Sequence, residues 1–103
     1  MVTPLILTTD SRDDGSLVLR ATGELDLSNI DAFSEALASA RKEGQDNQLS
    51  VDLSGVDYLD SGAISVLFDH AAGIQIVVNP ILMSVLTISG LTKVATVKPA
   101  SQI

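Results

Sequence analysis

The chain has 103 residues, of which 46% are hydrophobic and none is cysteine, and its formal net charge is −7. This length suits one domain with its own core, and the apolar fraction argues against a disordered chain. The lack of cysteine excludes disulfides, thiolate metal sites and cysteine nucleophiles. The negative charge and the presence of only three aromatic residues argue against a nucleic acid partner.

No apolar run reaches the ~20 residues of a membrane span, and the first ten residues lack the basic region of a signal peptide. We therefore expect a cytoplasmic protein that does not insert into a membrane. A single domain is expected over residues 1–103, with an ordered core of about 5–97 and a flexible tail over 98–103.

Strand-like and helical patterns alternate along the chain. A turn-forming cluster separates the first two strands and predicts a hairpin. Each later strand follows a segment with helical apolar spacing, which predicts right-handed crossovers, parallel pairing and an α/β fold. The expected strands are 5–9, 17–23, 49–53, 74–78 and 93–97, and the expected helices are 28–44, 61–70 and 81–89.

The core is expected to form between adjacent parallel strands and the apolar faces of the helices. Strand residues expected in it are Val51, Leu53, Ile74, Ile76 and Val78. Helix residues expected to pack over them are Ile30, Phe33, Leu37, Ile64, Leu67, Leu82 and Val85.

Charge is unevenly distributed, because all thirteen acidic residues lie between Asp10 and Asp69 and only Lys93 and Lys98 follow. One end of the fold should therefore be strongly acidic and the other nearly neutral. A basic protein surface is the natural partner for the acidic end.

Few residues are suited to catalysis. His70 is the one histidine, and it lies too far along the same predicted helix from Ser61 to form a Ser–His pair. The chain has no Gly-rich phosphate-binding motif, and one histidine without cysteine makes a transition-metal site improbable. We expect no catalytic residue, metal or cofactor, and a binding or switch protein rather than an enzyme.

Residues 51–68 are the most informative segment, because they predict a buried strand, an acidic loop and a helix that begins at Ser61. Backbone N–H groups at a helix start are unpaired, and the helix dipole there favours negative charge. A phosphate on Ser61 would add a charge of about −1.5 to −2 outside the core. The simpler interpretation is that Asp60 and Ser61 only cap the helix.

Two segments resemble the STAS domain of bacterial anti-sigma factor antagonists. They are Gly23-Glu-Leu-Asp26 after a strand and Val51-Asp-Leu-Ser-Gly-Val-Asp-Tyr-Leu-Asp-Ser61 before a helix. Ile88-Ser-Gly-Leu91 is similar to the end of that family's third helix, and the resemblance covers about 17–97. It implies a small α/β domain with a mixed, mostly parallel sheet of four to five strands and helices packed on one face.

The resemblance also implies a function. Family members bind an anti-sigma factor that is a serine kinase, and phosphorylation of a serine abolishes this capture until a serine phosphatase restores it. Carried over, Ser61 would be the phosphoacceptor, with Asp26 facing the kinase and Asp60 shaping the loop. The partner-binding residues expected on this basis are Asp26, Ser28, Asp57, Asp60, Ser61, Gly62 and Ser65.

The sequence departs from the family pattern Asp-Ser-Ser/Thr-Gly-Leu-Gly, because it reads Asp60-Ser-Gly-Ala-Ile-Ser65 and its second helix is short. These departures keep open a STAS adaptor that is never phosphorylated, as a subunit of a transporter or sensory complex. A third alternative is a small ligand-binding α/β domain.

Overall fold

A computed structural model describes residues 5–44 and 48–100. The chain forms one five-stranded sheet in the order β1-β2-β3-β4-β5. β1 and β2 are antiparallel, and every other neighbouring pair is parallel. The strands are β1 (Ile6–Ser11), β2 (Leu17–Leu25), β3 (Leu49–Leu59), β4 (Ile74–Val78) and β5 (Thr96–Pro99). The helices are α1 (Ile30–Gly44), α2 (Ser61–Asp69) and α3 (Met83–Ser89), with 3-10 turns at Pro80–Leu82 and Leu91–Lys93.

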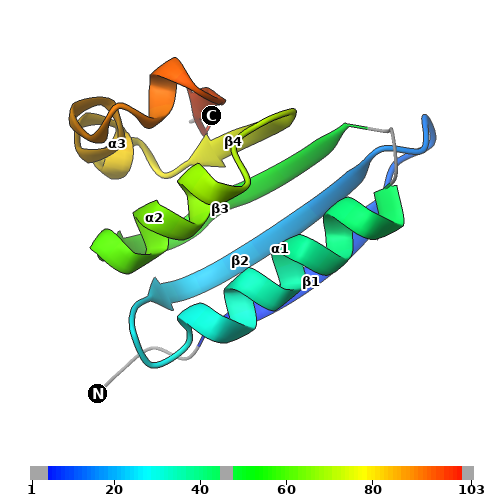
Figure 1. Cartoon of the computed structure of the whole chain (residues 1–103), viewed down its shortest axis with the longest axis horizontal. Coiled ribbons are helices and arrows are strands. Elements are labelled where there is room, and N and C mark those ends of the chain that lie inside the picture. The colour runs from blue at the N-terminus through cyan, green and yellow to red at the C-terminus, as the bar shows by residue number, and fades with distance from the viewer. Residues whose placement is uncertain (1–4, 45–47, 101–103) are drawn as a thin grey trace.

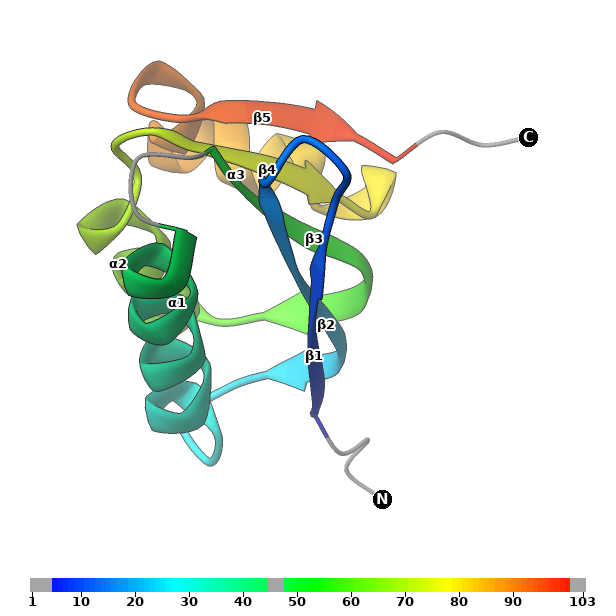
Figure 2. The same cartoon turned by 90° about the vertical axis from the view of Figure 1, so that its right-hand side faces the viewer.

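The helices α1 and α2 cover one face of the sheet and leave the other face open, as Figure 2 shows. α3 lies at the end of the sheet where β3 and β4 finish (Figure 1). The expected α/β fold, with a mixed and mostly parallel sheet and helices on one face, is therefore confirmed.

One continuous hydrophobic core fills the space between the sheet and the helices. The expected strand residues of β3 and β4 are all buried and pair in parallel register, as in Val51 with Ile76. Phe33 and Leu37 of α1 and Leu67 of α2 are fully buried, as their spacing predicted. The prediction was wrong for Val85, which is 40% exposed because Leu82 and Leu86 supply the apolar contacts of that helical segment.

The last strand begins three residues later than expected, because Leu91–Lys93 forms a 3-10 turn before β5. Lys98 and Pro99, placed by the sequence in a terminal tail, are the end of β5 and pair with Val77 and Val78. Ala100 also donates its N–H to the Val78 carbonyl at 2.7 Å. The rest of the expected tail, 101–103, and the first four residues lie outside the described residues.

Candidate functional site

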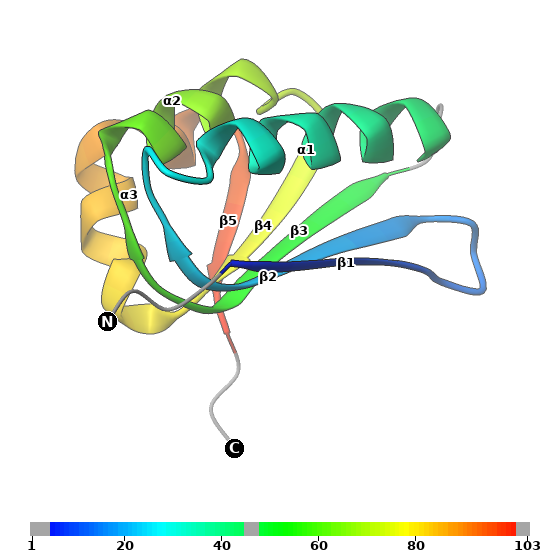
Figure 3. The same cartoon turned by 90° about the horizontal axis from the view of Figure 1, so that it is seen from below.

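The candidate site forms where two neighbouring parallel strands end. Leu25 of β2 pairs with Leu59 of β3, so the next residues, Asp26 and Asp60, begin two adjacent loops. The Asp60 N–H donates to the Leu25 carbonyl at 3.2 Å and joins the loops. Figure 3 shows the connections from β2 into α1 and from β3 into α2 beside each other at this end of the sheet. Aspartates far apart in the sequence thereby become neighbours.

β3 is longer than the sequence predicted, and its length positions the site. The prediction ended this strand at Leu53 and placed a loop before Asp60, but β3 continues to Leu59. Beyond Leu53 it pairs with β2 alone, through irregular register that includes Thr22 opposite Gly55. A Cβ on Gly55 would stand 2.5 Å from the Thr22 methyl carbon, so the missing side chain permits this close pairing.

Asp60 caps α2 and presents Ser61. Its backbone is extended, with φ −98° and ψ −178°, and its Oδ1 accepts a hydrogen bond from the Ala63 N–H at 3.0 Å. This geometry is that of an N-cap residue. It agrees with the capping role that the sequence predicted for Asp60. Ser61 is the first helical residue and is exposed. Its hydroxyl therefore lies in the part of the helix where the dipole favours negative charge.

The loop after β2 is shaped by its own side chains. Asp26 Oδ1 accepts hydrogen bonds from the Ser28 N–H at 2.9 Å and from the Ser28 hydroxyl. Asn29 accepts from the Asp26 N–H at 3.1 Å and donates to the Glu24 carbonyl at 2.8 Å. α1 begins at Ile30, two residues later than expected, and Ser28 belongs to the loop before it. Asp26 is thus held in a compact turn beside α2.

Leu27 is a site residue that the sequence analysis missed. Its side chain is 81% exposed although it lies between Asp26 and Ser28 in a polar loop. A Cβ on Gly62 would contact its Cδ2 at 3.8 Å, so Leu27 reaches the first turn of α2 beside Ser61. The sequence held one signal for this role, a single leucine among the polar residues of an acidic loop. An exposed leucine at this place offers a partner an apolar contact.

The structure brings together most of the residues expected at the site. Asp26, Ser28, Asp60, Ser61 and Gly62 gather around the two loops, and Ser28 and Ser61 are exposed. Ser65 is exposed one turn further along α2. Asp57 is also exposed, but it lies within β3 rather than in a loop.

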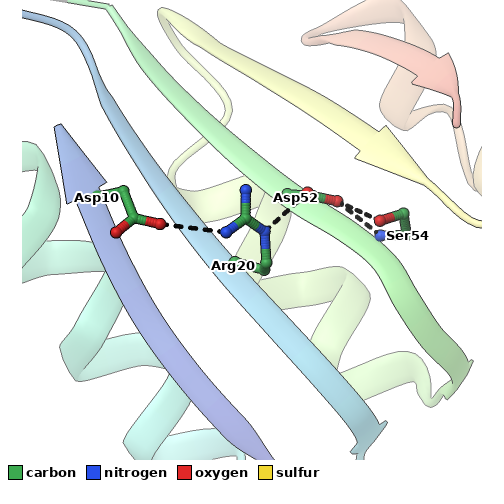
Figure 4. A network of polar contacts seen from close by, with 4 residues as sticks. All are labelled: Asp10, Arg20, Asp52 and Ser54. Atoms are coloured by element: carbon green, nitrogen blue, oxygen red, sulfur yellow. Dashed lines mark hydrogen bonds and ion pairs between the residues drawn. The ribbon is translucent and has the colours of Figure 1, made fainter. Parts of the chain in front are cut away.

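A second group of aspartates lies on the open face of the sheet (Figure 4). Arg20 of β2 forms ion pairs with Asp10 of β1 and Asp52 of β3, each with an N–O distance of 3.1 Å. Ser54 donates two further hydrogen bonds to Asp52, from its N–H at 2.9 Å and from its hydroxyl at 2.6 Å. Burial raises the pKa of Asp52, but the Ser54 hydrogen bonds and the Arg20 guanidinium outweigh it and hold that pKa below its usual value.

Other features of the described residues do not suggest a second chemical site. An open hollow of about 420 Å³ lies at the opposite end of the sheet, beside Gly73, Lys93 and Thr96. In residues 5–44 and 48–100, no three histidine, aspartate or glutamate side chains come close enough to hold a metal ion. None of the helices in the same part of the chain has the length and apolar character needed to cross a membrane.

Comparison with known proteins identifies relatives of this fold. A family model described as "Mlab, STAS domain" matches residues 8–97. No curated protein matches the sequence. An anti-sigma factor antagonist from Mycobacterium paratuberculosis has a similar structure, with a TM-score of 0.82 and 22% identity over 94% of this chain and 87% of that one.

The anti-sigma factor antagonist SpoIIAA is similar in two forms. The phosphorylated form of the Bacillus protein gives a TM-score of 0.66 at 16% identity, covering 94% of this chain and 93% of that one. The unphosphorylated form gives 0.70 at 17% identity, covering 94% and 90%. At these identities the structural likeness establishes the fold.

Proposed function

The chain belongs to the STAS domain family, and from this premise we propose that it is an anti-sigma factor antagonist that binds a kinase-type anti-sigma factor and is switched by phosphorylation of Ser61. The observation that carries the proposal is the exposed Ser61 at the start of α2, directly after the Asp60 cap and beside the Asp26 loop. A cytoplasmic location and the absence of catalytic activity follow from the same proposal.

Capture would use the acidic end of the sheet. Asp26 and Asp60 have their carboxylates committed to backbone N–H groups, which fixes the two loops in one arrangement. No ion pair to either of them occurs among residues 5–44 and 48–100, where the only ion pairs are those of Arg20. A basic partner surface would therefore meet an uncompensated negative potential together with the apolar Leu27.

Release would follow from the added phosphate. The phosphate group would stand beside the carboxylates of Asp26 and Asp60, and it would also repel the nucleotide phosphates of a kinase partner. One exposed like-charge contact costs only about 1 kcal/mol, but several in a desolvated interface cost several times as much. Because Ser61 is exposed, the phosphorylated domain should stay folded. A serine phosphatase would then restore the binding form.

Phosphoryl transfer tests the proposal directly. The protein and its Ser61→Ala and Ser65→Ala variants are incubated with ATP and each kinase-type anti-sigma factor of the source organism, and the products are analysed by mass spectrometry. We expect one phosphate in the wild type and in Ser65→Ala, and none in Ser61→Ala. Phosphate on Ser65 or Ser54, or an unmodified protein, would contradict the switch.

Gly62 favours a second candidate, a STAS adaptor that is never phosphorylated and forms a fixed subunit of a transporter or sensory complex. Gly62 occupies the position of the second hydroxyl in the family pattern, and a Cβ there would lie 3.3 Å from Asp60 Oδ1 and 3.8 Å from Leu27 Cδ2. A permanent contact through Leu27 would need no switch. An unmodified Ser61 in that incubation, together with stable binding of a transporter or sensory protein in a separate pull-down, would support the adaptor.

A further inference from the structure

A patch of exposed apolar side chains lies on the outer side of α3 and the turn before it. Ile81 is 66% exposed, Val85 40% and Ile88 85%. Phe68 of α2 is 38% exposed, and its ring tip lies 4.0 Å from the place that a Cβ on Gly90 would occupy, at the end of α3. We call these four residues the α3 patch.

The spacing of the helical segment explains why these residues are exposed together. Ile81, Val85 and Ile88 are four and three residues apart, which places them on one face of a helical run. Leu82 and Leu86 lie on the other face and are buried in the core. Apolar residues thus occur on both faces, and only one face is covered by the rest of the chain.

The α3 patch is continuous with the candidate site. Ser61, Ser65 and Phe68 are exposed at positions four and three residues apart on α2, so one side of this helix runs from the acidic loops to the patch. In Figures 1 and 3, α3 lies near α2, and the 3-10 turn that follows α3 contacts α2. A partner that spans α2 would reach both regions.

The two regions differ in charge. The sequence from His70 to Thr92, which holds three of the four patch residues, contains no acidic residue, lysine or arginine, and only Phe68 has an exposed acidic neighbour, Asp69. The other twelve acidic residues lie between Asp10 and Asp60. A partner surface that covers the α3 patch must therefore be apolar, while the surface that covers the acidic loops must be basic.

The size of the patch argues against a dimer formed through this patch alone. The largest apolar patch on a typical monomer covers roughly 300–600 Å². A stable specific interface needs about 800 Å² from each partner. The patch together with the outer side of α2 and the two loops would reach that size, so it is better understood as one part of a larger interface.

Taken with the proposed function, on which this inference rests, these observations lead to a two-part interface. We propose that the α3 patch is a second docking surface for the same kinase-type partner, and that it receives an apolar segment of that partner. The acidic loops carry the switch at Ser61, and the α3 patch supplies affinity that does not depend on charge. Phosphorylation would then weaken only the first part of the interface.

Calorimetry with the purified anti-sigma kinase tests this division at 50 mM and 500 mM NaCl. Ile88→Ser should weaken binding at least tenfold at both salt concentrations. Asp26→Asn should weaken binding chiefly at 50 mM, because salt screens the charge that it removes. Ile6→Ser, which changes an exposed isoleucine on β1, is the matched control and should bind like the wild type.

The outcomes separate this inference from the proposed function. Equal affinity of Ile88→Ser and Ile6→Ser, with Asp26→Asn weakened, would overturn the α3 patch alone. Failure of the wild type to bind any kinase-type anti-sigma factor would remove the proposed function and the patch with it. A dimer in sedimentation that Ile88→Ser dissolves, or binding to zwitterionic phospholipid vesicles that Ile88→Ser abolishes, would assign the patch to another occupant and also overturn the inference.

Discussion

The two groups of aspartates in this molecule have opposite surroundings. On the open sheet face, Asp10 and Asp52 share the guanidinium of Arg20, so much of their charge is compensated within the fold. At the end of β2 and β3, Asp26 binds the Ser28 N–H in its own loop and Asp60 binds the Ala63 N–H in the first turn of α2, and their charge remains available to a partner. Aspartates therefore form ion pairs between strands on the open face of the sheet, and present negative charge to a partner at the end of β2 and β3.

A substitution in the core should have the largest effect on the free energy of unfolding. Leu37 of α1 is fully buried in the core, and Leu37→Ala should lower the free energy of unfolding by about 2–5 kcal/mol through lost burial and a residual cavity. Urea denaturation measures the change. Ser39→Ala on the exposed side of α1 is the control and should stay within about 0.5 kcal/mol of the wild type.

A charge added at Ser61 should act on binding rather than on stability. We expect Ser61→Asp to weaken capture of the kinase partner at least about tenfold, or ~1.4 kcal/mol, because it places a further carboxylate beside Asp26 and Asp60. Ser61→Ala should bind the kinase partner whether or not ATP is present, because it cannot be phosphorylated at this position. Ser39→Asp adds the same charge on α1, away from the site. If calorimetry shows the same loss for Ser39→Asp, the effect is general repulsion and the two loops are not the contact.

Two substitutions of Asp60 can separate its role as a helix cap from its role as a negative charge. Asp60→Ala should cost about 0.5–2 kcal/mol of stability, because the Ala63 N–H loses its acceptor. Asp60→Asn should retain most of that stability, since asparagine caps helices about as well as aspartate. Thermal unfolding and kinase binding are measured on both variants. An Asp60→Asn protein that is as stable and binds as tightly as the wild type would leave this carboxylate with a capping role alone.

The open-face group should respond to acid rather than to a partner. The pKa of Asp52 is lowered in the folded protein, so its ionised form contributes stability above the ordinary carboxyl value of 3.8, and this stability is lost as the pH falls through the lower folded value. Asp52→Asn should therefore destabilise the protein by less than about 1 kcal/mol at pH 7, because the pair is partly exposed to solvent. The difference should vanish in strong acid.

Arg20→Met provides the matching test on the other half of the ion pair. It removes the guanidinium that binds both Asp10 and Asp52. In a double-mutant cycle with Asp52→Asn, we expect a coupling energy of about 0.2–1 kcal/mol at low salt, and less at high salt. A coupling energy of zero at low salt would show that the hydrogen bonds from Ser54 alone stabilise the ionised form of Asp52.

Elements with a strong local pattern could be predicted from the sequence. The helix that begins at Ser61 follows from Asp60 and the apolar residues after it, and the strand 74–78 follows from its uncharged β-branched run. Boundaries that depend on a neighbouring strand could not be predicted. β3 reaches Leu59 only because β2 runs beside it and Gly55 admits Thr22, and neither fact is visible in either segment alone.

The sequence by itself determined the order of the elements, the parallel core strands and the position of Ser61 after a helix cap, because these depend on spacing and on residues close together in the chain. Only the tertiary structure decided that Asp26 adjoins Asp60, that Leu27 reaches Gly62, and that Val85 faces solvent. An apolar period shows which residues share a face of a helix. Whether another segment covers that face depends on strand register and on contacts between residues distant in the chain.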